Sequence, residues 1–157
     1  MRTKEEIYKD LRIGNIFQFL VEGRTEYWHI ADILTNDFEV YFKENPDYDH
    51  STHLTPVVIT EQVLLKCGFT VSKSDDVYEY DVYSIQISNN RVLCFCKPPV
   101  VDTHSGERKV AEYWWFDSFF GQSFCNFCDD FWNKPKYLHQ LQNLYYSLTG
   151  VELNVTL

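Results

Sequence analysis

Residues 135–150 read PKYLHQLQNLYYSLTG, and this stretch carries the clearest structural pattern in the chain. Its apolar residues recur every three or four positions, as on one face of a helix. They are Leu138, Leu141, Leu144, Tyr145 and Leu148. Proline is favoured at the first helical position and glycine just beyond the last, so the pattern predicts a helix over residues 135–149. We expect Leu141 and Leu144 to lie in the core.

Upstream of this helix the apolar residues recur every second position, which is typical of strands. The alternation begins at Leu11, resumes over residues 25–34 after a turn at 22–24, and resumes again from Phe38. Three short strands with tight connections over residues 11–44 predict an N-terminal β unit, either a meander or an SH3-like barrel. Residues 45–54 are polar and are expected to form a loop.

A short helix is predicted over residues 60–68, because both of its ends are marked. Thr60 is a good N-cap, and Gly68 fits the left-handed position that follows a helix. Phe69 would supply the apolar contact that accompanies such an end.

Residues 77–133 predict a second β section made of a twisted antiparallel sheet with hairpins. Strands at 80–88 and 91–97 flank Asn89-Asn90, a two-residue hairpin pattern. Strands at 100–103 and 108–116 flank a second turn, and residues 117–133 are aromatic and expected to be irregular. Residues 151–157 can add an edge strand. The sequence therefore predicts a single α+β domain, 1–157, with the C-terminal helix packed on a sheet face.

Composition limits the class of protein. The 157 residues include 14 Lys and Arg against 23 Asp and Glu, a formal net charge of −9, and 17% aromatic residues. The aromatic content excludes a disordered chain. The acidic balance argues against general nucleic-acid binding and against an anionic membrane surface as partner. We expect no secretory signal, no transmembrane helix and a cytoplasmic location with reduced cysteines.

Two groups of side chains have partial metal-ligand spacing. Cys94 and Cys96, with Cys125 and Cys128, would supply four thiolates for zinc, although the spacing is not that of a familiar zinc ribbon. His50-Ser51-Thr52-His53 contains two imidazoles in a polar loop. Buried thiols and solvated histidines are the favoured interpretations, so we predict no metal and no cofactor.

No catalytic motif is recognisable. Ser105 lies beside His104 in a turn, where neighbours in sequence rarely form a nucleophile–base pair. Asp129 and Asp130 are adjacent, and adjacent positions of a regular element face apart. We predict no catalytic residues.

Three strings together resemble a known group of sequences. They are LRIGN at 11–15, ITEQVLLKCGF at 59–69, and HQLQNLY at 139–145 followed by LTGVEL at 148–153. In order and spacing they resemble a family of small uncharacterised proteins from phages, prophages and mobile elements of Bacteroides-type bacteria. The resemblance implies a shared fold and a mobile-element setting. It implies no activity, because the family has none assigned.

One aromatic and basic tract is the main binding candidate. It contains His104, Arg108, Lys109, Tyr113 and Trp115. Aromatic planes beside cations can hold a nucleobase and its phosphate, and the same residue types dominate protein–protein contacts. An aromatic core is the alternative interpretation of this tract.

A second candidate is the polar row His139, Gln142 and Asn143 on the last helix. These side chains either bond to loop backbone at the boundary of the core or form a recognition edge.

The sequence thus favours a non-catalytic binding protein of a phage or prophage. It would act in counter-defence, by masking a host protein or by sequestering a nucleotide signal, and this step rests on the resemblance. The alternative is a small hydrolase-type enzyme whose active site has no recognisable motif. The expected partner is a host protein or a small nucleotide-like ligand, and the sequence leaves a homo-oligomer open.

Overall fold

The computed structural model describes residues 10–34, 39–47, 54–74, 79–96, 99–101, 108–110, 115–120, 123–125 and 135–157; from 99 to 125 it describes backbone alone. The chain divides into two compact units. Unit 1 comprises Met1–Ile59, Pro135–Leu153 and Leu157, and unit 2 comprises Thr60–Lys134 and Asn154–Thr156. In the described ranges, antiparallel sheets and two helices make this a mixed α+β fold.

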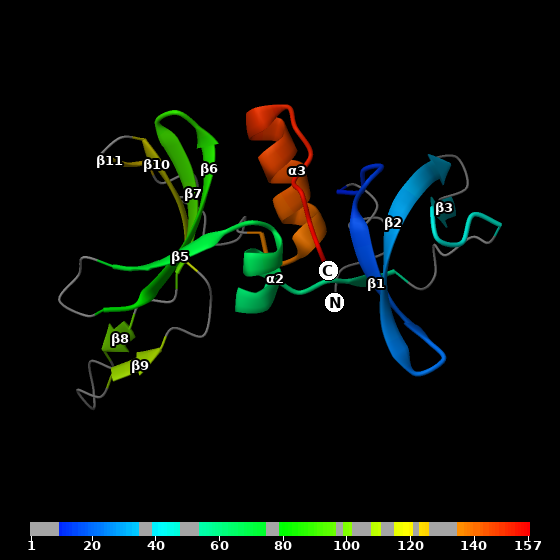
Figure 1. Ribbon diagram of the computed structural model, residues 1–157, viewed down its shortest axis with the longest axis horizontal. Coiled ribbons are helices and arrows are strands. Elements are labelled where there is room, and N and C mark those ends of the chain that lie inside the picture. The colour runs from blue at the N-terminus through cyan, green and yellow to red at the C-terminus, as the bar shows by residue number, and fades with distance from the viewer. Residues whose placement is uncertain are drawn as a thin grey trace. The chain divides into compact units, whose positions relative to one another are not determined.

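Unit 1 contains a four-stranded antiparallel sheet and the longer helix (Figure 1). The strand order is β3-β2-β1-β4. The elements are β1 (Ile16–Val21), β2 (Arg24–Leu34), β3 (Glu39–Phe42), β4 (Thr55–Pro56) and α3 (Leu138–Thr149). The tight β1–β2 turn at Glu22-Gly23 has positive φ at both residues, 49° and 79°, which suits the twist of a hairpin.

The core of unit 1 forms where the two-residue period of the strands brings large apolar side chains to one side. One cluster of this core consists of Phe17, Trp28, Ile30, Val40 and Phe42. The predicted strands of residues 11–44 are therefore confirmed in outline, except at their start. The first strand begins at Ile16 and not at Leu11, because Gly14 has a φ of 88° and Asn15 donates its backbone N–H to the Arg12 carbonyl, closing a turn.

The long helix is confirmed, but its predicted start at Pro135 is wrong. Tyr137 has an extended conformation, and residues 136–138 pair with 57–59 instead of coiling. The Leu138 N–H donates to the Val57 carbonyl at 2.8 Å, and the Ile59 N–H donates to the Lys136 carbonyl at 3.0 Å. The helix therefore begins at Leu138.

The apolar stripe of α3 is confirmed only in its first half. Leu138 and Leu141 are fully buried, whereas Leu144, Tyr145 and Leu148 are half-buried. The prediction that Leu141 is core is thus confirmed, and the prediction that Leu144 is core is wrong.

Unit 2 contains a five-stranded antiparallel sheet and the shorter helix (Figure 1). The strand order is β11-β10-β7-β6-β5, and β8 and β9 form a separate two-stranded sheet. The elements are α2 (Glu61–Lys66), β5 (Thr70–Lys73), β6 (Asp81–Ser88), β7 (Arg91–Cys96), β8 (Pro99–Val101), β9 (Arg108–Val110), β10 (Trp115–Phe120) and β11 (Ser123–Cys125).

Both predicted ends of α2 are confirmed. The Thr60 hydroxyl accepts a hydrogen bond from the Val63 N–H at 3.2 Å. Gly68 has a φ of 83° and donates to the Leu65 carbonyl, while Phe69 donates to the Leu64 carbonyl. These two bonds satisfy carbonyls at the helix end, as in a Schellman motif, and the Phe69 side chain is buried.

The two hairpins of the second β section are confirmed, but the single strand predicted over residues 108–116 is wrong, because β9 ends at Val110 and Trp115 begins β10 in the other sheet. Ser88 pairs with Arg91 across Asn89-Asn90, but neither asparagine has positive φ, and the register shifts by a bulge between Gln86 and Ser88. The irregular structure expected for residues 117–133 is wrong for part of that tract. Strands β10 and β11 form there, since dense aromatic residues had hidden their two-residue period.

The C-terminal residues 151–157 form no strand. Thr156 instead donates its N–H to the Lys66 carbonyl at the end of α2. Within the described part of the chain, neither helix is long and apolar enough to cross a membrane.

Candidate functional site

The first predicted site is only partly within the described residues. Arg108 and Lys109 lie on β9, opposite Val101 and Val100 of β8. Trp115 begins β10, opposite Cys96 of β7. His104 and Tyr113 lie outside the described residues, so the five-residue set stays a prediction.

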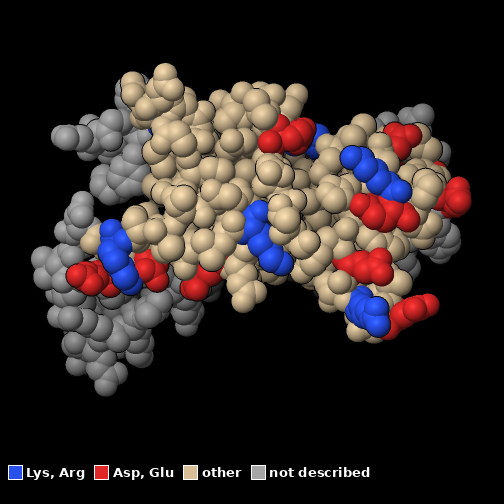
Figure 2. Space-filling view, in the orientation of Figure 1, with Lys and Arg blue, Asp and Glu red and all other residues tan. Residues whose placement is uncertain are grey.

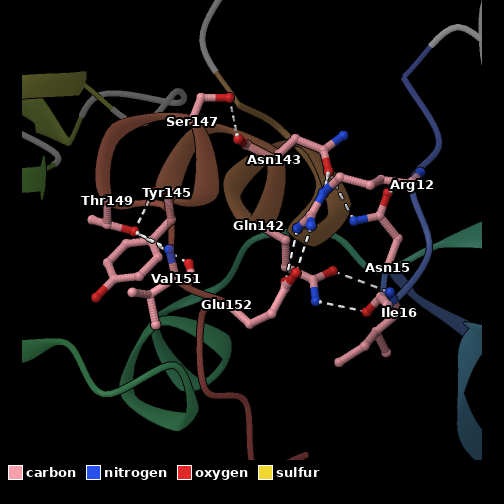
Figure 3. Close-up of polar contacts among 11 residues, drawn as sticks. Arg12, Asn15, Ile16, Gln142, Asn143, Tyr145, Ser147, Thr149, Val151 and Glu152 are labelled. Carbon is pink, nitrogen blue, oxygen red and sulfur yellow. Dashed lines mark hydrogen bonds and ion pairs between the residues drawn. The ribbon is translucent and has the colours of Figure 1, made fainter.

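The second predicted site lies in a network of polar side chains in unit 1, which we call the polar joint (Figure 3). It comprises Arg12, Asn15, Gln142, Asn143 and Glu152. The first two precede β1, the next two are on α3, and Glu152 follows the helix. The joint therefore connects two parts of the sequence that are 128 to 140 positions apart.

Gln142 is buried, and both the oxygen and the nitrogen of its side-chain amide form hydrogen bonds with backbone groups. Its Oε1 accepts from the Ile16 N–H at 3.0 Å, and its Nε2 donates to the Gly14 carbonyl at 3.2 Å. A buried backbone group without a partner is costly, and one side chain here satisfies two of them. These are the contacts of the first interpretation, a boundary residue that bonds loop backbone.

Asn143, the next residue of α3, forms hydrogen bonds to the segment that precedes β1. Its Oδ1 accepts from Asn15 Nδ2 at 2.9 Å and from Arg12 Nε at 3.2 Å. Its Nδ2 donates to the Asp10 carbonyl. Asn15 is fully buried, and its Oδ1 accepts from the Arg12 N–H at 2.9 Å, which fixes the turn before β1.

Through Arg12 the polar joint extends to Glu152, which is exposed at the surface. Its guanidinium binds both carboxylate oxygens of Glu152, at 2.5 and 2.8 Å, and lies 4.2 Å from the Tyr146 ring centroid. The hydrogen bond from Arg12 lowers the pKa of the Glu152 carboxyl, against a smaller opposing effect of burial. The bidentate geometry makes this the most specific ion pair among the described residues.

His139 takes no part in the joint, although the sequence grouped it with Gln142 and Asn143. Its imidazole is buried and stacked on the Phe17 and Tyr137 rings, with centroids 5.1 and 5.8 Å away. The structure thus brings Gln142 and Asn143 together and places His139 in an aromatic stack.

A hydrogen-bonded contact between His29 and Glu44, which the sequence did not indicate, lies on the sheet of unit 1. Glu44 accepts from the His29 N–H at 2.8 Å and contacts His29 Nδ1 at 2.7 Å. Burial raises the pKa of Glu44, but the hydrogen bonds from His29 act against it, and the net pKa is lowered. The contact attaches the turn that follows β3 to strand β2.

The cysteines show no assembled metal site in the part of the chain with described side chains. Cys94 is buried, Cys96 is half-buried, and the two strand positions pair with Asp117 and Trp115 of β10. Among the described residues no three potential metal ligands come together. Cys128 lies outside these residues, as do both histidines of the loop, so the zinc alternatives stay untested.

Cys67, the C-cap residue of α2, is buried. Burial raises the pKa of its thiol to about 12. The thiol therefore stays protonated at neutral pH, and protonated thiols are poor nucleophiles and poor metal ligands.

Charge is mixed over the described surface. On the face shown in Figure 2, most Lys and Arg side chains lie beside Asp or Glu. Such a distribution is typical of solvated surface and does not by itself mark an anion-binding site.

No protein-family model matches the chain, no curated protein is significantly similar to it, and no solved structure matches it significantly.

Proposed function

We propose that the protein is a non-catalytic binding protein of a phage or prophage, and that residues 99–132 carry its binding surface. The supporting observation is the separate β8–β9 sheet, in which two of the three β9 residues, Arg108 and Lys109, are cationic. A two-stranded sheet is marginally stable by itself. Contact with a partner would stabilise it.

The residue types on and near this hairpin suit an anionic partner. Arg108 and Lys109 can form charge-assisted hydrogen bonds to phosphate or carboxylate. Tyr113 and Trp115 can provide stacking planes. The ligand is then either the acidic surface of a host protein or a nucleotide-like signal, and binding either one would serve counter-defence in the cytoplasm of the bacterial host.

The mobile-element family that the three strings resemble is part of the same proposal. Two of these strings contain the polar joint: Arg12 and Asn15 in the first, and Gln142, Asn143 and Glu152 in the last. Because the two strings hydrogen-bond to each other in unit 1, this contact supports a shared fold for sequences that contain both strings.

The finer description of the fold also belongs to this proposal. We propose that residues 11–44 form an SH3-like or meander β unit and that the C-terminal helix packs on a sheet face. The consecutive antiparallel order of β1, β2 and β3 is that of a meander and supports the first part in that form. The stack of Phe17 in β1 on His139 in α3 supports the second.

The test is native mass spectrometry of the full chain, with and without lysate of a Bacteroides-type host. We expect a retained small anion or a host protein with the unmodified chain, and loss of that species with Arg108→Ala combined with Trp115→Ala. Arg24→Ala is the matched control, because Arg24 is an exposed arginine on β2 of unit 1. Normal binding by the double variant, with its circular dichroism unchanged, would place the site elsewhere.

A further inference from the structure

The chain leaves unit 1 and returns to it through two segments that are paired with each other. The first part of unit 1 ends at Ile59, and its second part begins at Pro135. Next to these points, residues 57–59 and 136–138 form a short antiparallel pairing, which we call the clamp. The clamp therefore closes unit 1 at the place where residues 60–134 depart and come back.

The clamp is largely buried. Val57, Ile59 and Leu138 are at most 3% exposed, whereas Val58, between the first two, is 55% exposed. This alternation is that of a strand with one buried face. The two hydrogen bonds of the clamp, 2.8 and 3.0 Å long, each involve a buried residue.

Other contacts bind the two parts of unit 1 directly to each other. The bonds of the polar joint connect the segment before β1 with α3 and Glu152. The Phe17 ring of β1 stacks on the His139 ring of α3. All of these residues belong to unit 1. In unit 2, the strands of the five-stranded sheet likewise pair with one another.

We propose that the clamp allows unit 2 to open while unit 1 stays folded. Unit 1 closes a loop that contains residues 60–134. The entropy cost of closing a flexible loop grows only with the logarithm of its length, so unit 1 can hold the two ends together when unit 2 is unfolded. The bond from Thr156 to Lys66 opens with unit 2, to which both residues belong. This inference does not depend on the proposed binding surface.

A cross-link across the clamp of the full chain tests the proposal. Val58 and Tyr137 are a non-hydrogen-bonded antiparallel pair, because the bonds of the clamp join the residues on either side of them. The Cα atoms of such pairs lie about 4.5 Å apart, which a disulfide can span. Val58→Cys combined with Tyr137→Cys should therefore form a disulfide on oxidation, and peptide mapping verifies it. The same variant kept reduced is the matched control, since it contains both substitutions.

Hydrogen exchange at two amides, measured in urea below the unfolding midpoint, gives the result. The Ile30 N–H, bonded to the Asn15 carbonyl, reports on unit 1, and the Phe69 N–H, bonded to the Leu64 carbonyl, reports on unit 2. The disulfide constrains the unfolded form of unit 1, so exchange at Ile30 should slow about tenfold or more. Exchange at Phe69 should not change, because the clamp already holds the ends of the loop when unit 2 opens.

Equal slowing at both amides would overturn the proposal, because the two units would then open together. Failure of the disulfide to form, or unchanged exchange at Ile30, would overturn it as well, since the clamp would not be holding unit 1 closed. The unmodified chain gives a second measure. The Ile59 and Leu138 amides of the clamp should exchange together with Ile30, and exchange of these amides together with Phe69 would contradict the proposal.

Discussion

Unit 1 is assembled from two segments that lie far apart in the sequence, whereas unit 2 comes almost entirely from one continuous segment. The two units also differ in what is buried. The buried polar residues among the described side chains are Asn15, His139 and Gln142, and all of them belong to unit 1. Among the described side chains of unit 2, which end at Cys96 apart from Asn154–Thr156, the buried residues are hydrophobic, and among the largest are Leu64, Phe69, Leu93 and Phe95.

The difference shows how a discontinuous unit obtains its specificity. Apolar contact is non-directional, so it fixes the distance between α3 and the strands better than their alignment. Directional bonds from Gln142 and Asn143 fix which residues of the N-terminal segment face which turn of the helix. A continuous unit with hairpins needs fewer directional side-chain bonds, since its turns already set the register of the strands.

The largest effect should come from the core of unit 2. Phe95 is fully buried near the C-terminal end of β7, with its ring centroid 5.7 Å from that of Phe69. Phe95→Ala should lower the free energy of unfolding by about 3–5 kcal/mol. Chemical denaturation measures the loss.

The same variant shows whether the two units unfold separately. The Gly14 N–H donates to the Ile30 carbonyl, and the Ile30 N–H donates to the Asn15 carbonyl. Both bonds lie within unit 1, so these two amides report on that unit alone. If the units are independent, hydrogen exchange at these two amides stays slow in Phe95→Ala. If their protection falls by the same free energy, residues 1–157 form one cooperative domain, and the contrast between the units does not extend to stability.

The second effect concerns the polar joint. Gln142→Leu removes two hydrogen bonds and leaves the buried Ile16 N–H without its acceptor, so unfolding should become easier by about 1–3 kcal/mol. Ser147→Ala is the control on the same helix, because Ser147 is exposed and bonds only to the Asn143 carbonyl. Equal melting temperatures for the two variants would mean that apolar packing alone aligns α3.

Sequence reasoning worked best where the determinants are local. Thr60 and Gly68 act within a few residues of α2, so their roles were predictable. β5 was missed, because its four residues are exposed at a sheet edge and only Val71 is apolar. The start of β1 was misplaced, since alternating residues before it bend through Gly14.

The polar joint was only half visible in the sequence. Gln142 and Asn143 stood out as polar residues beside an apolar stripe. Their partners Arg12, Asn15 and Glu152 did not, because no local period relates residues more than a hundred positions apart. The strings LRIGN and LTGVEL carry the available indication, since both belong to the resemblance and both contain members of the joint.

A third effect tests the local closure of α2. Gly68 has a φ of 83°, and a Cβ there would meet no atom within 4 Å. Gly68→Ala should therefore cost only the backbone strain of the left-handed conformation, about 1–2 kcal/mol. Thermal denaturation measures this loss, with Lys66→Ala as the control, because Lys66 is an exposed residue two positions earlier. A smaller loss for Gly68→Ala than for the control would contradict the assigned helix end.

The smallest effect is the pH dependence of the Arg12–Glu152 pair. The hydrogen bond from Arg12 lowers the pKa of Glu152 in the folded chain below its unfolded value. A lowered carboxyl pKa stabilises the fold above the unfolded pKa, and this contribution is lost as the pH falls through the folded pKa. Because the pair is largely exposed, it should contribute no more than about 1 kcal/mol.

Glu152→Gln should therefore reduce stability slightly at neutral pH and make no difference in acid, where the carboxyl of the unmodified chain is protonated. Glu44 is the matched comparison, because its pKa is also lowered, through His29, and Glu44→Gln should show the same sign. The two contributions should add, since the Glu44 pair and the polar joint share no residue. Melting temperatures of both single variants and the double variant, measured from neutral to acidic pH, decide the point. A Glu152→Gln chain that keeps the full acid sensitivity of the unmodified protein would show that the bidentate pair orients the C-terminal segment without stabilising unit 1.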